Sequence, residues 1–153
     1  MANNKQKESG RILPHSIEAE EAVLGCMLIN TNAVPKAIQI LEKNSFYSTT
    51  NQIIFDSMVE LFDHNKTIDY VSITDQLKKN KKLEEIGGAY FITGLSKNAP
   101  SAENIDYYAQ IVKEKFILRQ IIQVSRKISS EAYDSTDEVT TILDKAEQIL
   151  FTF

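Results

Sequence analysis

The stretch from Ser101 to Ser135 contains neither glycine nor proline, and it limits the possible folds more than any other part of the sequence. Glycine and proline are the residues that most often interrupt helices, so this stretch predicts one continuous helix. At ~1.5 Å per residue, a helix of about 30 residues would be ~45 Å long. Such a length is unusual in a small domain and favours an all-helical fold.

The apolar residues of this predicted helix change face along its length. The first half carries one stripe at spacings of three and four: Ile105, Tyr108, Val112 and Phe116. The second half carries a stripe rotated by more than a quarter-turn: Ile117, Ile121, Val124 and Ile128. A third face holds Tyr107, Ile111, Leu118 and Ile122. A helix with different apolar faces has different neighbours along its length, so the second half needs a partner of its own.

A final helix supplies part of that partner. After a turn at Asp134 and Ser135, Thr136 is a candidate helix cap, and apolar residues then recur at spacings of three and four through Phe153. Two long helices joined by a short turn form an antiparallel hairpin, which cannot cover all of its own apolar surface. A second copy of the chain is the simplest source of the missing surface. We predict that the hairpin core and the contact between copies use Ile117, Ile121, Val124, Ile128, Ile142, Leu143, Ile149 and Leu150.

The rest of the chain predicts a globular helical head in front of the hairpin. Pro100 disfavours helix at Ala99 and marks the boundary, which gives a disordered polar tail (1–13), a helical head (14–99) and a helical hairpin (100–153). Candidate helix starts in the head are Ser16, Thr49 with Gln52 as a capping box, and Ser72 with Asp75. A Gly87-Gly88 break precedes a last short helix, Ala89–Ser96.

Composition limits the partners and the compartment of such a domain. The formal net charge is −4, whereas a module that grips DNA through its phosphates usually has a basic surplus, so we expect little direct nucleic-acid binding. Cys26 is the only cysteine, which excludes an intramolecular disulfide and favours a reducing cytoplasm. The apolar run from Ala22 to Ile29 is far too short to span a bilayer, so we expect no membrane partner.

The sequence predicts no catalytic residue, no cofactor-binding residue and no metal ligand. No glycine is followed by Lys and Ser or Thr, as a phosphate-binding loop requires. His15, His64 and Cys26 are scattered without ligand spacing, and we expect local hydrogen bonding for the histidines and a buried inert thiol. Charged and aromatic groups that could carry chemistry are better explained as solvated helix ends and packing residues: Glu18, Glu20 and Glu21; Lys78, Lys79, Lys81 and Lys82; Tyr107 and Tyr108.

Several short segments, in a fixed order, resemble one protein family. The first is Pro14-His15-Ser16-Ile17-Glu18-Ala19-Glu20-Glu21-Ala22-Val23-Leu24-Gly25, followed by Phe46-Tyr47, Ile53-Ile54-Phe55, Ile68-Asp69, Leu83 to Phe91, Pro100 to Ile105, Tyr107-Tyr108-Ala109, Ile111-Val112 and Leu118-Arg119. Each segment alone is a weak signal, but together they cover about 110 residues. In order and spacing they resemble the amino-terminal domain of the bacterial DnaB-type replicative DNA helicase.

This resemblance implies a function without catalysis in these residues. In the family the domain pairs through its hairpins, and three pairs form a collar that binds the carboxy-terminal domain of primase. A helicase loader is a further candidate partner. ATP, Mg²⁺ and strand unwinding would belong to a RecA-like motor domain elsewhere in a helicase of the bacterial cytoplasm. Two alternatives stay open: the related helicase-binding domain of a primase, and a small helical regulatory or DNA-binding protein.

Overall fold

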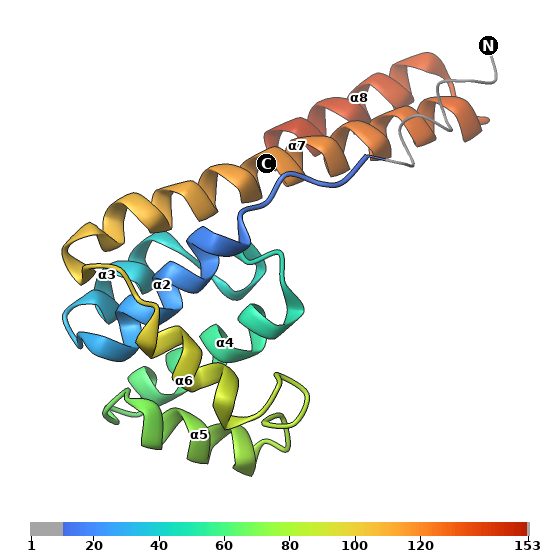
Figure 1. The fold of residues 1–153 in the computed structure, drawn as a ribbon. Coiled ribbons are helices and arrows are strands. Elements are labelled where there is room, and N and C mark those ends of the chain that lie inside the picture. The colour runs from blue at the N-terminus through green and yellow to red at the C-terminus, as the bar shows by residue number, and fades with distance from the viewer. Residues whose placement is uncertain (1–10, 153) are drawn as a thin grey trace. The chain divides into compact units, whose positions relative to one another are not determined.

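The computed structural model describes residues 11–152, and all regular structure within them is helical (Figure 1). The elements, in chain order, are α2 (Ile17–Ile29), α3 (Ala33–Ile40), the 3-10 turn η1 (Lys43–Ser45), α4 (Thr49–Asp63), α5 (Tyr70–Lys79), α6 (Ala89–Lys97), the 3-10 turn η2 (Ala102–Asn104), α7 (Ile105–Asp134) and α8 (Val139–Phe151). The predicted all-helical fold, a globular head followed by a long helical hairpin, is confirmed. Most of the predicted disordered tail, residues 1–13, lies outside the described residues.

The chain divides into two compact units, with the division in α7 between Phe116 and Ile117. The larger unit, which we call the head, comprises His15–Phe116, and the smaller one, the hairpin unit, comprises Ile117–Phe153 together with residues up to Pro14. The boundary predicted at Pro100 lies earlier in the chain than this division. In the structure the first turns of α7 contribute to the core of the head, so they group with it.

The core of the head is built around α2, which packs against α3, α4 and α6. The largest fully buried side chains come from several elements: Phe46, Phe55, Leu24, Met27, Ile54, Met58, Ile73, Leu77, Ile92 and Ile105. Phe46 and Phe55 lie with their ring centroids 4.8 Å apart. Burying a side chain of this kind contributes about 1.5–3 kcal/mol, so the head contains enough apolar side chains for a core of its own.

The helix ends show where local prediction succeeded and where it failed. The predicted cap at Ser16 is confirmed, since its side chain accepts a hydrogen bond from the Ala19 amide. The capping box predicted at Thr49 is wrong by one residue, because Ser48 accepts from the Asn51 amide instead. Helix α5 begins before the predicted start at Ser72, because Asp69 and Ser72 cap each other reciprocally. Glu138, not Thr136, precedes α8.

The close packing of α2 on α6 depends on Gly25. A β-carbon at this position would lie 2.5 Å from the Leu95 carbonyl oxygen and 2.8 Å from the Ala99 β-carbon. We expect Gly25→Ala to lower the free energy of unfolding by about 1–3 kcal/mol, because the two backbones must separate. Urea denaturation monitored by circular dichroism measures the change.

The matched control is Gly94→Ala, the same substitution in the helix that faces Gly25. A β-carbon at Gly94 would meet nothing within 4 Å, so alanine there should stabilise α6 by about 0.5–1 kcal/mol through helix propensity. Equal destabilisation by both substitutions would contradict the close approach of α2 and α6.

The hairpin unit consists of the second half of α7 and of α8, which runs back beside it (Figure 1). The turn between the two helices is stabilised at Asp137, whose carboxylate accepts a hydrogen bond from the Lys145 ammonium group at 2.7 Å. This partner raises the pKa of Lys145 above its ordinary value. The pair is solvent-exposed, so its contribution to stability is small.

Candidate functional site

The candidate functional site is the apolar surface of the hairpin unit. On α7, the half-buried residues Ile117, Val124 and Ile128 fall on one stripe. On α8, the half-buried residues Ile142, Ala146 and Ile149 form a corresponding stripe. Residues at spacings of three and four lie on one face of a helix, so these two stripes form the seam along which α7 and α8 pack.

A second apolar stripe on each helix has no cover within the described residues. On α8, Leu143 is 57% exposed and Leu150 is 60% exposed, and Val139 shares their face. On α7, Leu118 is 44% exposed and Ile121 is 46% exposed. At ~100° per residue, each exposed stripe lies roughly 70–80° around its helix from the seam. We call the exposed set, which comprises Leu118, Ile121, Val139, Leu143 and Leu150, the open stripe.

The structure therefore divides the eight residues predicted to form the hairpin core and the contact between copies. Five of them, Ile117, Val124, Ile128, Ile142 and Ile149, are half-buried and occupy the seam. The other three, Ile121, Leu143 and Leu150, are exposed and belong to the open stripe. Leu118 and Val139 complete the open stripe but were not among the predicted contacts. Their place at three- and four-residue spacing from Ile121 and Leu143 was the signal in the sequence.

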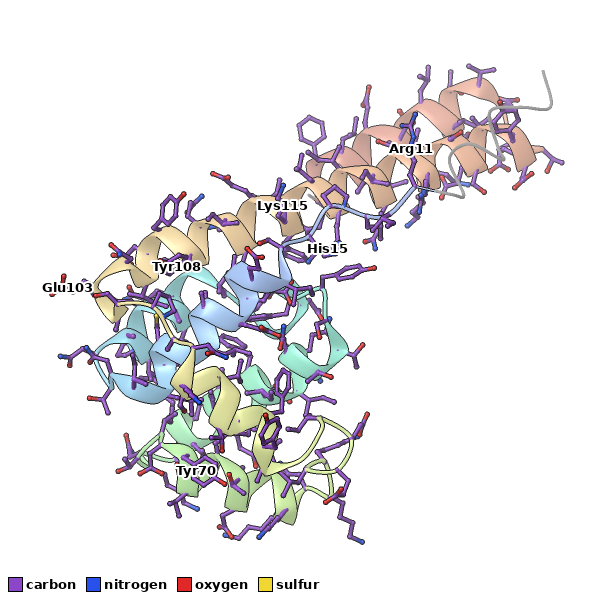
Figure 2. All side chains as sticks on the ribbon, viewed as in Figure 1. Arg11, His15, Tyr70, Glu103, Tyr108 and Lys115 are labelled. Atoms are coloured by element: carbon purple, nitrogen blue, oxygen red, sulfur yellow. The ribbon has the colours of Figure 1, made fainter. Side chains whose placement is uncertain are left out.

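Arg119 is a further residue of the hairpin unit, and it was not among the predicted contact residues. It is buried, and its guanidinium group donates a hydrogen bond of 2.8 Å to the Pro14 carbonyl oxygen. This bond ties the extended segment that begins at Arg11 to α7, and Figure 2 shows Arg11 beside the hairpin. A buried Arg is stable only with such acceptors, so Pro14 and Arg119 hold each other in place.

Glu20 corrects one expectation about the head. We expected it to share a solvated first turn with Glu18 and Glu21, but it is only 1% exposed. Its carboxylate accepts hydrogen bonds from the backbone amides of Tyr47 and Ser48 and from the Asn51 side chain, at 2.9, 3.2 and 3.1 Å. Glu20 therefore supplies acceptors for the start of α4, and its role is to position α4 against α2.

The two histidines differ in their contacts, and the contact of His64 with Glu60 is local in the sequence. The imidazole of His15 stacks on the Tyr47 ring, with centroids 4.1 Å apart and planes 10° from parallel. His64 lies with Nδ1 2.7 Å from the Glu60 carbonyl oxygen at the end of α4, which confirms the predicted hydrogen bonding at a helix end. Across residues 11–152, no group of three or more His, Cys, Asp or Glu side chains is arranged to hold a metal ion. Over the same range, no helix is both long and apolar enough to cross a membrane.

Cys26 is fully buried in α2, as predicted. Its thiol lies 3.6 Å from the Pro100 carbonyl oxygen, and burial raises the pKa of the thiol above its ordinary value of 9.0. The thiolate is the reactive form of cysteine, and both burial and the raised pKa keep it scarce in the folded chain. We therefore expect Cys26 to resist iodoacetamide in the folded chain and to react fully in urea.

The same pKa shift implies a pH dependence of stability. The folded state keeps the Cys26 proton to a higher pH than the unfolded state does. The contribution of Cys26 to stability is therefore intact below pH 9.0 and is lost as the pH rises further.

Mass spectrometry after timed labelling with iodoacetamide measures the reactivity of the Cys26 thiol. Rapid alkylation of the folded chain at neutral pH would contradict the buried position.

Comparisons with known proteins show which family the sequence resembles. Residues 12–114 match the family model described as the DnaB-like helicase N terminal domain. The chain is 39% identical over 140 residues to a replicative DNA helicase DnaB from Geobacillus stearothermophilus, covering 92% of this chain and 31% of that protein. It is 38% identical over 140 residues to a replicative DNA helicase DnaC from Bacillus subtilis, with the same coverage of 92% and 31%. The chain thus spans about a third of the length of these relatives.

Solved structures show the same fold. The N-terminal domain of the DnaB helicase from Mycobacterium tuberculosis aligns with a TM-score of 0.86 at 27% identity, covering 93% of this chain and all of that one. The N-terminal domain of the DnaB helicase from Helicobacter pylori, described together with its interactions with primase, aligns with a TM-score of 0.64 at 22% identity. That alignment covers 75% of this chain and 89% of the other.

Proposed function

The chain belongs to the family of DnaB-like helicase N-terminal domains, and we propose that it is the non-catalytic collar domain of a bacterial replicative DNA helicase. In this proposal the domain has two tasks. It associates with copies of itself through the hairpin unit, and it binds the carboxy-terminal domain of primase. ATP hydrolysis, Mg²⁺ binding and strand unwinding belong to the rest of the helicase, which works in the bacterial cytoplasm.

The open stripe is the observation that carries the proposed self-association. It exposes large aliphatic side chains on two adjacent helices, at the three- and four-residue spacing that a helix uses to pack on another helix. Large exposed apolar patches on a protein surface mark interaction sites, and contacts with other proteins are among them. A second copy offers the same stripe, so a two-fold contact would cover both at once. We propose a dimer of this kind, and three such dimers in the hexameric helicase.

The proposed binding to primase rests on family membership and on solved relatives that are described together with primase. Direct grip on nucleic acid is not part of the proposal. The net charge of −4 opposes it, because contacts to phosphates require a basic surface.

Light scattering tests both tasks with the 17.3 kDa chain itself. Measured alone over a range of concentrations, it should have the mass of a dimer or of a larger even-numbered assembly. Mixed with the carboxy-terminal domain of the primase from the same bacterium, the assembly should gain mass. A monomer at every concentration would contradict the self-association, and an unchanged mass in the mixture would contradict the binding to primase.

A further inference from the structure

The side of α7 that faces away from α8 is partly covered within the hairpin unit. Arg119 is 6% exposed and Ile122 is half-buried. At ~100° per residue, these two residues lie roughly 140–160° around α7 from the seam, so α8 does not cover them. The other described part of the hairpin unit is the segment from Arg11 to Pro14, which runs beside α7 (Figure 1). This segment is therefore the part of the unit that can cover Arg119 and Ile122.

The rise of the two elements places Leu13 level with Ile122. The hydrogen bond from the Arg119 guanidinium group fixes the Pro14 carbonyl at the level of Arg119. Figure 2 shows Arg11 beside the paired part of the hairpin, so the segment follows α7 from Arg119 toward its end. An extended chain rises ~3.3 Å per residue and a helix ~1.5 Å, so Leu13 lies about two to three helical residues beyond Arg119. Leu13 and Ile122 are both half-buried, as two aliphatic side chains in contact would be.

The segment contacts α7 with one side only. Leu13 is half-buried whereas the neighbouring Ile12 is 77% exposed, and successive side chains of an extended chain point to opposite sides. Residues 11–16 contain no helix or strand, so no ladder of backbone hydrogen bonds holds them. Segments with few buried apolar contacts open locally at a small cost in free energy. The segment is thus docked on α7 by a small number of contacts that can be released without unfolding the helices.

We propose that residues 12–14 form a detachable strap, and that Arg119 and Ile122 are its docking site on α7. The site takes an extended peptide, because the guanidinium group donates to a backbone carbonyl while Ile122 covers the aliphatic side chain one residue earlier. Release of the strap exposes Ile122, which lies one helical turn from Leu118 of the open stripe. The strap therefore controls how much apolar surface α7 presents to solvent. Its docking requires neither the proposed self-association nor primase.

The test measures the order of the strap by ¹⁵N relaxation of the Leu13 amide in the whole chain. In the unmodified chain we expect an order parameter near that of rigid backbone, about 0.85. Arg119→Met keeps a long side chain of high helix propensity but removes the donor to Pro14, and the order parameter of Leu13 should fall below about 0.6. Arg119→Lys retains a donor and should give an intermediate value. Circular dichroism shows that the helices of each variant remain folded.

A matched pair of variants in the strap itself decides the outcome even if Arg119→Met fails to fold. Leu13→Ser removes the aliphatic side chain that meets Ile122, whereas Ile12→Ser makes the same kind of change at the exposed neighbour. Trypsin cleaves after Arg11, and the bond is accessible only when the strap is released. Relative to synthetic peptides of residues 6–16 with the same substitution, cleavage should be at least ~tenfold slower in the unmodified chain and in Ile12→Ser. In Leu13→Ser most of this protection should be lost.

Three results would overturn the proposal. One is a mobile Leu13 amide in the unmodified chain, because the strap would then not be docked. Another is an unchanged order parameter in a folded Arg119→Met chain. The third is equal protection from trypsin in Leu13→Ser and Ile12→Ser, since the side of the segment that faces α7 would then not matter.

Discussion

Ile121→Asp is expected to abolish self-association of the chain while leaving its folding almost unchanged. Ile121 is 46% exposed in the single chain, so a carboxylate there can remain solvated and should cost the fold little. In a dimer that covers the open stripe, the same carboxylate would be buried without a partner, which costs several kcal/mol. The dissociation constant of the dimer should therefore rise by a factor on the order of 10² or more.

Sedimentation equilibrium measures the dissociation constant, and thermal denaturation of the diluted chain measures folding. The matched control is Gln123→Asp, which adds the same charge at an exposed position on roughly the opposite side of α7. Leu143→Asp should reproduce the effect of Ile121→Asp from α8, because both residues belong to the open stripe. An unchanged dimer in both stripe variants would show that this surface is not the interface.

A charge in the seam should behave differently. Val124 is half-buried where α7 and α8 pack, so Val124→Asp should weaken the hairpin itself as well as the dimer. Comparing Val124→Asp with Ile121→Asp therefore separates the interior of the hairpin from its outer surface. Three residues apart on one helix, the two positions differ in which neighbour covers them.

The sequence alone did not distinguish residues of the seam from residues of the open stripe. Spacing of three and four places residues on one face of a helix, and on that basis Ile121, Val124, Leu143 and Ile149 all counted as interface or core residues. Which face meets the other helix depends on the rotation of each helix in the hairpin, and apolar character alone does not specify it. The length of α7 and the break at Gly87-Gly88 were predictable, because glycine and proline act locally.

Helix starts were less predictable because several adjacent residues could serve as caps. Ser48, Thr49 and Thr50 all carry hydroxyl groups, and the structure uses Ser48. The Ser48 amide also donates a hydrogen bond to the Glu20 carboxylate. A contact with the distant helix α2 therefore coincides with the observed start of α4. The choice between neighbouring caps was thus coupled to tertiary structure, which composition and spacing do not reveal.

Glu20 shows the same coupling most clearly. Acidic residues in the first turns of a helix usually stay in solvent and interact favourably with the positive end of the helix dipole. Glu18 does remain exposed. The hydrogen-bond partners of Glu20 lie 27–31 residues further along the chain. No local pattern distinguishes Glu20 from Glu18, because the two differ only in that Glu20 contacts the start of α4.

Glu20→Ala is expected to lower the free energy of unfolding by about 3–5 kcal/mol. The substitution would remove the acceptor for two backbone amides and for the Asn51 side chain, and each hydrogen bond to a charged group contributes about 1.5–3 kcal/mol. The Asn51 Oδ1 atom already has no hydrogen-bond partner among the described residues, so the amide would be left without any. Unsatisfied buried donors retain their full cost of desolvation.

Urea denaturation of the chain measures this loss, with Glu18→Ala as the matched control in the same turn of α2. Glu18 is exposed and forms no ion pair within residues 11–152, so its removal should change stability by less than about 0.5 kcal/mol. Glu20→Gln should fall between the two, because one amide oxygen can still accept while the amide nitrogen faces a donor. Similar small effects of Glu20→Ala and Glu18→Ala would mean that Glu20 does not hold α4 against α2.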